Sequence, residues 1–473
     1  MITLSRGLAR SFRSVMRRSV MASFPRGPAP PVLAVAGPEG LTLRAAYQEV
    51  GLTLRLPTDG ADSDKIAFRG DVLAGLEGTG SEPVTLEAVS ADKGQARFQD
   101  RGVPQVVDFD LIDAEQTPDL LLAKRRLTPM PRGFLKALDD ACRTASRDEK
   151  LALHRIQLRG KAGQIVASDG KQLLVQGGFP LPFGADILVP ALPVFGAREL
   201  AHADSVCLGR SEGRLLLRAG SWCFDLKIDT LGRFPNVDKV IPSSTKPTRL
   251  TVDEGDAQFL LEAIPSLEGS DDEPPLITLD LGQAALIRAR GDSASTEVCL
   301  CNSRVTSQPI RVCFDRQYFV RALRLGFRSF EVHGPDRPLL ARADERLYVF
   351  AVLSDKLAVE ASPDTVRLMT TATVPAQASN AVELTAAQAR SAPGNHPSEE
   401  RNPIMATSHN GTDGHQDQPE AFDPLTEAEA LKVALQEALN RSTRLIAGLR
   451  QVRKQHKAVA SAMASLRQFQ LTP

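Results

Sequence analysis

The chain has 473 residues, and its 57 lysine and arginine residues balance 57 aspartate and glutamate residues. This length accommodates about three cores of ordinary domain size and a tail. A net charge of zero argues neither for nor against nucleic acid as a partner. No run of about 18 apolar residues occurs, so we predict that no part of the chain spans a membrane.

The six cysteines all lie in stretches with a strand or helix pattern. Cys299 and Cys301 form a C-x-C sequence, with no second pair of ligands to complete a zinc site. We therefore predict reduced thiols in a cytoplasmic protein, with neither a metal ion nor another cofactor.

The first predicted element is an amphipathic helix that begins near residue 4. Residues 1–38 contain six arginines and no acidic residue. The apolar face of this helix consists of Leu4, Leu8, Phe12 and Val15. The opposite stripe carries four arginines: Arg6, Arg10, Arg13 and Arg17. Taken alone, the stripe fits a solvated basic face, a mitochondrial targeting peptide or a helix that faces phosphate.

A strand pattern follows this helix. Apolar stretches at residues 32–36 and 41–45 flank a Gly-Pro-Glu-Gly turn, and a third stretch alternates through Leu52, Leu54 and Leu56. These stretches predict a hairpin and a further strand, before a second helix near residue 69.

The same order of elements recurs twice more along the chain. First helices begin near residues 132 and 254, and second helices begin near residues 190 and 316, each followed by short strands. In the second copy, residues 153–159 and 164–168 are predicted to pair across a turn at residues 160–163. A period of roughly 125 residues is typical of three similar domains in series. Since a targeting peptide would not begin a repeated series, we assign the first helix to the fold.

The first helices of the three copies differ in charge. In the second copy one face carries basic residues interrupted by Asp139 and Asp140; the basic residues are Arg132, Lys136, Arg143 and Arg147. In the third copy the helix is acidic, with Asp253, Glu254, Asp256 and Glu262. A helix of this charge would repel phosphate groups, which predicts uneven contacts if the partner is DNA.

Two phrases in the middle copy carry a family resemblance. They are Ala-Ser-Asp-Gly-Lys-Gln-Leu at residues 167–173 and Gly-Arg-Phe-Pro-Asn-Val-Asp-Lys-Val-Ile-Pro at residues 232–242. Both phrases, in this order within a triple repeat, resemble the bacterial DNA polymerase sliding clamp, the beta clamp. The resemblance covers about residues 1–355. It implies an α+β fold of three tandem clamp domains, each with two helices packed on antiparallel sheets, which we place at residues 1–122, 123–246 and 247–357.

The resemblance also implies a function. Sliding clamps of this family are non-enzymatic head-to-tail homodimers that close into a ring around duplex DNA. The ring tethers the replicative DNA polymerase and gives processivity, and polymerase and clamp loader bind it through short linear peptides. A clamp here would be nucleoid-associated in the cytoplasm. Our candidates for contacts to phosphate are the basic residues of the first helices: Arg6, Arg10, Arg13, Arg17, Arg132, Lys136, Arg143 and Arg147. Weaker additions are Arg321, Arg324 and Arg328 on the second helix of the third copy.

In the family, partner peptides bind an apolar groove between the second and third domains. The residues that match by position are Leu153, Ser168, Gly170, Lys171, Gln172, Leu173, Pro235, Lys239, Val240, Phe350, Ala351, Val352 and Leu353. The alternative interpretation is that these residues form the core of a domain seam.

The groove and the tail depart from the family pattern. The family has His-Arg where Lys171 and Gln172 stand, and Met-Pro-Met where residues 351–353 are Ala-Val-Leu. These departures, together with a chain that continues past the closing strand, favour an alternative function. This is a clamp-like paralogue that serves DNA repair or another DNA transaction through a different partner motif and its coiled-coil tail.

The last part of the chain has a different character. Residues 358–422 are rich in small and polar residues and are predicted to form a disordered linker. Residues 423–470 have apolar residues at a 3-4 spacing, from Leu431 and Leu435 to Leu466, which predicts a coiled-coil helix with an unidentified partner.

Overall fold

The computed structural model describes residues 1–22, 28–57, 63–114, 127–148, 150–267, 275–290, 295–306 and 308–370. These residues belong to one compact unit, Met1–Ser379. The predicted coiled coil at residues 423–470, and the linker from residue 371 onward, lie outside the described residues. Within the described ranges, no helix is long and apolar enough to cross a membrane.

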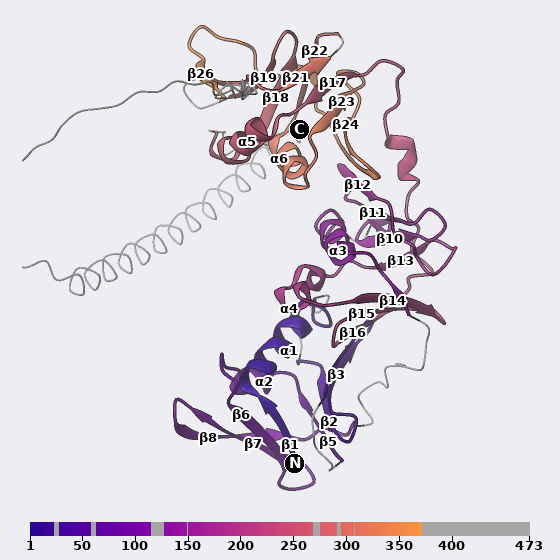
Figure 1. Ribbon diagram of the computed structural model, residues 1–473, viewed down its shortest axis with the longest axis vertical. Helices are drawn as coiled ribbons and strands as arrows, with labels where there is room; N and C mark the ends of the chain where they lie inside the picture. The colour runs from indigo at the N-terminus through magenta and orange to yellow at the C-terminus, as the bar shows by residue number, and fades with distance from the viewer. Residues whose placement is uncertain are drawn as a thin grey trace, which may run out of the picture. The chain divides into compact units, whose positions relative to one another are not determined.

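The first copy of the repeat consists of a strand, a helix, four strands, a second helix and three strands (Figure 1). Ser5 begins the first helix as its N-cap, because its Oγ accepts a hydrogen bond from the amide of Leu8 at 3.1 Å. The elements are β1 (Ile2–Ser5), α1 (Arg6–Arg18), β2 (Pro31–Ala36), β3 (Leu41–Tyr47), β4 (Val50–Leu56), β5 (Asp64–Arg69), α2 (Leu73–Leu76), β6 (Pro83–Ala88), β7 (Lys93–Asp100) and β8 (Val103–Asp110). The predicted hairpin and third strand are confirmed, since β2, β3 and β4 pair in order.

The second copy repeats this order with shorter helices. Its elements are β9 (Thr128–Pro129), α3 (Phe134–Cys142), η2 (Lys150–Ala152), β10 (Arg155–Arg159), β11 (Gln164–Ser168), β12 (Gln172–Gln176), β13 (Ile187–Pro190), η3 (Pro193–Gly196), α4 (Arg198–Ala201), β14 (Val206–Ser211), β15 (Arg214–Ala219), β16 (Trp222–Lys227) and η4 (Val237–Val240). The predicted pairing of β10 with β11 is confirmed. The second helices α2 and α4 are single turns.

The third copy has two longer helices. Its elements are β17 (Thr248–Thr251), α5 (Glu254–Ser266), β18 (Leu276–Leu281), β19 (Ala285–Arg290), β20 (Ser295–Leu300), β21 (Arg304–Thr306), β22 (Ile310–Asp315), α6 (Arg316–Arg324), β23 (Ser329–Val332), β24 (Leu339–Ala343), β25 (Arg346–Phe350), η5 (Asp355–Leu357) and β26 (Val366–Met369). The predicted starts of both helices, near residues 254 and 316, are confirmed.

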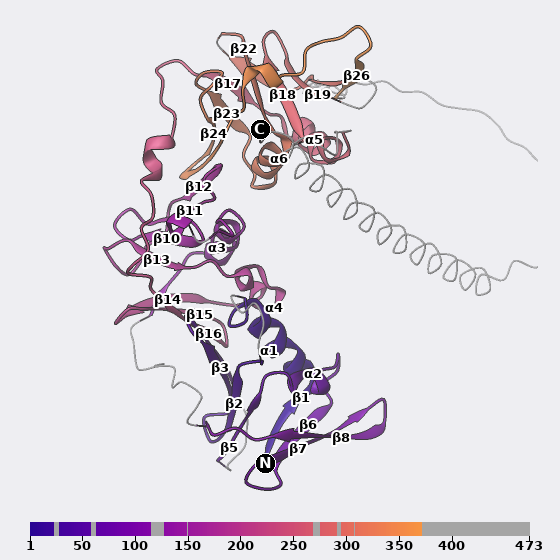
Figure 2. The same cartoon turned by 180° about the vertical axis from the view of Figure 1, so that it is seen from behind.

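Two of the four sheets contain strands of two copies. In the eight-stranded sheet β4 of the first copy pairs antiparallel with β16 of the second, and in the nine-stranded sheet β12 of the second pairs antiparallel with β25 of the third (Figure 2). The remaining sheets have the strand orders β1-β6-β7-β8 and β22-β18-β19-β20-β26. We call the β4–β16 and β12–β25 pairings the internal joints.

The helices bury their apolar faces on these sheets. On α1 the predicted apolar face is confirmed for Phe12 and Val15, which are buried, and for Leu8, which is half-buried. Leu4 is also buried, but it lies on β1, because the helix begins at Arg6 and not near residue 4. Phe12 stacks on Trp222 of β16 with ring centroids 6.2 Å apart, so this helix packs on a sheet that contains strands of two copies.

The cysteines are free thiols, as predicted. Burial raises the pKa of Cys142 to about 11 and that of Cys223 to about 12. Both side chains are therefore uncharged at neutral pH and pack as small apolar groups.

The third copy ends later than the composition predicted. The linker was expected from residue 358, but Val359 and Thr370 are buried at 5% and 4% exposure, and β26 lies between them. Its four residues, Val-Arg-Leu-Met, are all exposed and form too short a segment for a strand pattern to stand out in the sequence. The boundaries at 122/123 and 246/247 stay predictions, because the internal joints cross from copy to copy.

Candidate DNA-facing helices and partner groove

The arginines of α1 fall into two groups. Arg10 and Arg17 are exposed. Arg6 is 12% exposed in its side chain: its Nη1 lies 2.6 Å from Asp100 Oδ1, and its Nη2 donates to the carbonyl of Glu77 at 3.0 Å. Its guanidinium also lies 4.9 Å from the centre of the Phe98 ring.

Arg13 is engaged in a similar way, with its Nη1 2.9 Å from Glu77 Oε2. The four arginines share one helix stripe, as predicted, but Arg6 and Arg13 connect α1 to α2 and β7 rather than lying free. Helical spacing could not predict these ion pairs, because Glu77 is 64 positions after Arg13 and Asp100 is 94 positions after Arg6.

On α3 the acidic residues neutralise the basic stripe, as their interruption of it suggested. Lys136 pairs with Asp140, and Arg143 Nε lies 3.0 Å from Asp139 Oδ2, both at a spacing of four residues. Both carboxylates are buried, whereas the cationic side chains are more than half exposed. Arg132 and Arg147 are exposed, but they lie beyond the ends of the helix, which is shorter than the sequence pattern implied.

The acidic residues of α5 support the helix itself. Asp253 is the N-cap and accepts a hydrogen bond from the amide of Gly255 at 2.8 Å. Asp256 is fully buried and accepts from Ser303 Oγ at 2.6 Å. Burial alone would raise its pKa, but hydrogen bonds from neighbouring side chains outweigh burial and hold the pKa below its ordinary value. Asp253 and Asp256 therefore stabilise the start of α5 and its contact with Ser303.

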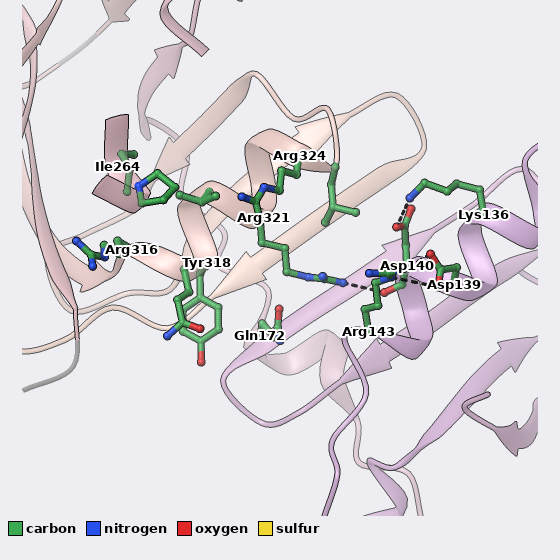
Figure 3. Close-up of a pocket in the computed structure, with 14 residues that line it drawn as sticks. Lys136, Asp139, Asp140, Arg143, Gln172, Ile264, Arg316, Tyr318, Arg321 and Arg324 are labelled. Carbon is green, nitrogen blue, oxygen red and sulfur yellow. Dashed lines mark hydrogen bonds and ion pairs between the residues drawn. The ribbon is translucent and has the colours of Figure 1, made fainter. Parts of the chain in front are cut away.

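Arg321 of α6 connects the second and third copies. Its Nη2 donates to the carbonyl of Asp140 at 2.9 Å and to Thr144 Oγ1 at 2.7 Å. Figure 3 shows this side chain extending from α6 to the end of α3. Arg324, one turn further along, is exposed, whereas Arg328 pairs with Glu254 at 2.9 Å.

A cavity of about 640 Å³ lies between α3 and α6. It brings together five of the predicted site residues, which are Lys136, Arg143, Gln172, Arg321 and Arg324. Arg316 and Tyr318 also line it and were missed by the sequence analysis. The spacing Tyr318, Arg321, Arg324 marks one face of a helix and could have indicated Tyr318.

The Asp-Gly turn of the first phrase is closed by its own polar groups. Ser168 Oγ donates to the carbonyl of Gln172 at 2.7 Å and accepts from the amide of Gly170 at 3.1 Å. Gly170 has a φ of +89°, a left-handed conformation that favours glycine, and a Cβ there would lie 3.8 Å from Leu153 Cδ1. The turn therefore places Leu153 and Gly170 side by side.

The predicted groove residues on β12 and β25 divide between core and surface. Leu173 is 2% exposed opposite Val349, and Phe350 is fully buried, as the seam interpretation expected. The amide of Ala351 donates to the carbonyl of Lys171 at 2.9 Å, which extends the pairing past β25. Val352 and Leu353 are half-buried, as is Gln172, whose Oε1 accepts from the Tyr348 hydroxyl at 2.6 Å.

The second phrase covers the outer face of this seam. Val237 packs in a small core with Leu173 and Val349. Pro235 is half-buried, and Lys239 and Val240 are exposed on η4, with Val240 at 50% exposure. The phrase thus leaves apolar and basic side chains on the surface next to the seam.

Comparison with known proteins indicates the fold. No family model matches the chain, and no curated protein matches it. Among solved structures, a DNA polymerase sliding clamp from Pseudomonas aeruginosa matches with a TM-score of 0.61 and 17% identity, over 75% of this chain and 99% of that one. A DNA polymerase III subunit beta from the same organism has a TM-score of 0.60 and 18% identity over the same shares. A sliding clamp from Bacillus subtilis has a TM-score of 0.60 and 16% identity, over 74% and 98%.

These likenesses span nearly the whole length of the matching clamps and about three quarters of this chain. They agree with the order of strands and helices in three successive copies. The chain therefore has the fold of the DNA polymerase sliding clamps.

Proposed function

We propose that this protein is a DNA sliding clamp. Two copies join head to tail into a ring around duplex DNA and tether a DNA polymerase, without catalysis of their own. The observation that carries the proposal is the repetition of the internal joints. In strand order β20 corresponds to β4 and β12, and β8 corresponds to β16 and β25. A second copy can supply the missing β8–β20 joint twice, which closes a ring with twofold symmetry.

The exposed cations on and beside the helices support a duplex partner. Arg10, Arg17, Arg132, Arg147 and Arg324 are exposed. Contacts from such side chains to phosphate are independent of base sequence and permit sliding, while the closed ring supplies retention. Arg6, Arg13 and Arg321 contribute less to DNA contact in this proposal, because their guanidinium groups already bind protein groups.

A trapping experiment tests this function. The protein is mixed with linear duplex, the ends are ligated, and the circle is passed through a gel-filtration column at a salt concentration that removes phosphate contacts. We expect the protein to remain on the circle and to leave it when a restriction enzyme opens the circle. Equal loss from open and closed DNA would show that no ring surrounds the duplex.

The same preparation allows a test of the cations. For Arg10→Ala/Arg17→Ala we expect the slope of log affinity against log salt on linear duplex to fall in magnitude by about 1.8, or roughly 0.9 per lost phosphate contact. The control is Lys65→Ala/Lys161→Ala, which removes two exposed cations away from the helices. Identical slopes for both variants would remove α1 from the DNA-contacting set.

The proposed partner groove lies beside the seam of the nine-stranded sheet. A linear peptide with leucine or phenylalanine side chains would contact Val240, Val352 and Leu153, which are exposed or half-buried. We expect Val240→Glu to weaken binding of a polymerase-derived peptide by about tenfold or more, because a carboxylate disfavours the apolar contact. Val89→Glu is the control, since Val89 is a valine of the first copy at 62% exposure. Equal peptide affinities would place the peptide elsewhere.

A second candidate function is a clamp-like paralogue for repair or another DNA transaction. The groove favours it, since Lys171, Gln172 and the Ala-Val-Leu of residues 351–353 differ from the residues that the family carries there. The two functions share the ring and differ in the peptide. Tighter binding of peptides from repair polymerases than from the replicative polymerase would favour the paralogue.

A further inference from the structure

The last described strand, β26, covers a sheet edge. It pairs in parallel with β20 over four residues, from Thr296 opposite Val366 to Cys299 opposite Met369. Both views show β26 at the margin of the third copy (Figures 1 and 2), where it is the edge strand of the sheet β22-β18-β19-β20-β26. β20 is the strand whose edge corresponds to those that form the internal joints.

The two internal joints share one pattern. We call β16 and β25, the later strand of each pair, the joining strands. The third residue of each is a buried aromatic opposite a leucine: Phe224 of β16 faces Leu52, and Tyr348 of β25 faces Leu174. Both joining strands, like β8, begin after a two-residue hairpin turn. β8 therefore corresponds in the first copy to the joining strands β16 and β25.

Applied to β8, this pattern gives a register. Its third residue is Gln105, which lies on the core side of its sheet because it pairs with Phe98. On β20 we match Leu52 and Leu174 with Val298, the residue of this strand that is fully buried. A joint between β8 of one copy and β20 of another therefore sets glutamine against Val298, without the aromatic that seals the internal joints.

In the structure Leu368 of β26 occupies the position next to Val298 that Gln105 of a second copy would take. It lies opposite Val298 at 36% exposure. Polar contacts fasten both ends of the strand: the amide of buried Thr370 donates to the carbonyl of Cys299 at 3.1 Å, and Thr365 Oγ1 lies 2.6 Å from Ser295 Oγ. β26 is thus held on the residues of β20 with which β8 of a second copy would pair.

β26 nevertheless differs from the strands of the internal joints. It runs parallel to its neighbour, whereas both joints are antiparallel and extend over five residues. Val366 and Met369 remain 54% and 70% exposed. A short edge strand with apolar side chains in water is a weak cover for a sheet.

We propose that β26 is an intramolecular competitor for the ring-closing edge, so that β8 of a second copy pairs with β20 only when β26 leaves it. The inference rests on the proposed ring. A strand tethered to its own domain has a high effective concentration, and the apparent affinity between copies is reduced by the fraction of chains whose edge is covered.

A reversible cross-link in the full chain tests the competition. Ser295→Cys/Thr365→Cys joins two positions whose side chains are already in contact. We expect the oxidised variant to remain monomeric at protein concentrations where the reduced variant dimerises, with at least a tenfold difference in the dimer dissociation constant measured by sedimentation. Thr365→Cys alone, oxidised and reduced in parallel, is the control for the native cysteines.

A second variant shifts the equilibrium the other way without touching β20. Leu368→Asp places a carboxylate against Val298 and is expected to tighten dimerisation at least tenfold. Equal dimerisation of the oxidised and reduced cross-link variants would overturn the competition, and weaker dimerisation of Leu368→Asp would show that β26 is part of the contact. In both cases trapping on circular DNA would persist. If no variant dimerises and none is trapped, the proposed ring itself is wrong.

Discussion

Tyr348→Ala is expected to lower the free energy of unfolding by about 3–5 kcal/mol, the usual cost of removing a large buried aromatic side chain. Tyr348 is fully buried, and its ring packs on Phe350 and Phe327 with centroids 5.6 and 6.1 Å apart. It lies on β25, so the cavity opens at the joint between the second and third copies. Urea unfolding followed by circular dichroism measures the loss.

Tyr348→Phe is the matched control. It keeps the ring and removes only the hydroxyl that donates to Gln172 Oε1 at 2.6 Å. We expect a loss of about 1 kcal/mol, the typical net value of one hydrogen bond. Similar losses for the alanine and phenylalanine variants would mean that the hydroxyl, and not ring packing, stabilises this joint.

Arg288→Leu is expected to cost about 3–5 kcal/mol, because it removes the buried partner of two carboxylates. Glu297 then keeps only Arg367, and half-buried Asp280 keeps only Arg311, both of which are more exposed than Arg288. Arg288 is 5% exposed, with Nε 2.7 Å from Glu297 Oε2 and Nη1 2.8 Å from Asp280 Oδ2. Glu297 is 8% exposed, so little water compensates its charge. The midpoint of urea unfolding reports the effect.

Two comparisons separate charge burial from lost packing. Arg288→Leu/Glu297→Gln removes the buried carboxylate that lost Arg288 and is expected to be more stable than Arg288→Leu alone. Lys93→Ala breaks the Lys93–Asp110 pair, whose side chains are 59% and 71% exposed, and is expected to leave the midpoint unchanged. A double variant no more stable than the single one would assign the loss to packing.

In the groove, the sequence predicts the local turn but not the burial of its neighbours. The Asp-Gly turn of residues 167–173 was predictable, because its closing bonds join residues at most four positions apart. Which neighbours become core was not predictable, since Leu173 is buried by Val349 from a strand 176 residues away. A sequence phrase locates a turn, but the strand that pairs with it determines what remains on the surface.

At the end of the third copy, long-range pairing orders a segment that the sequence predicts as a linker. Residues 358–370 have a composition typical of a linker, yet Thr370 is fixed by the backbone of residues 299 and 301 and β26 by that of β20. The strand has only four residues, which are too few for a period-two pattern to stand out from a linker.

The sequence by itself determined the threefold order of elements, the apolar face of α1, the acidic interruption of the α3 stripe and the turn of the first phrase. Each depends on helical or strand periodicity, or on bonds between residues a few positions apart. Only the tertiary structure decided that Arg6 and Arg13 bind carboxylates of other elements, that Arg321 connects α6 to α3, and that β26 covers the edge of β20. These contacts join residues distant along the chain, and charge or spacing within one element carries no information about the partner that folding brings to it.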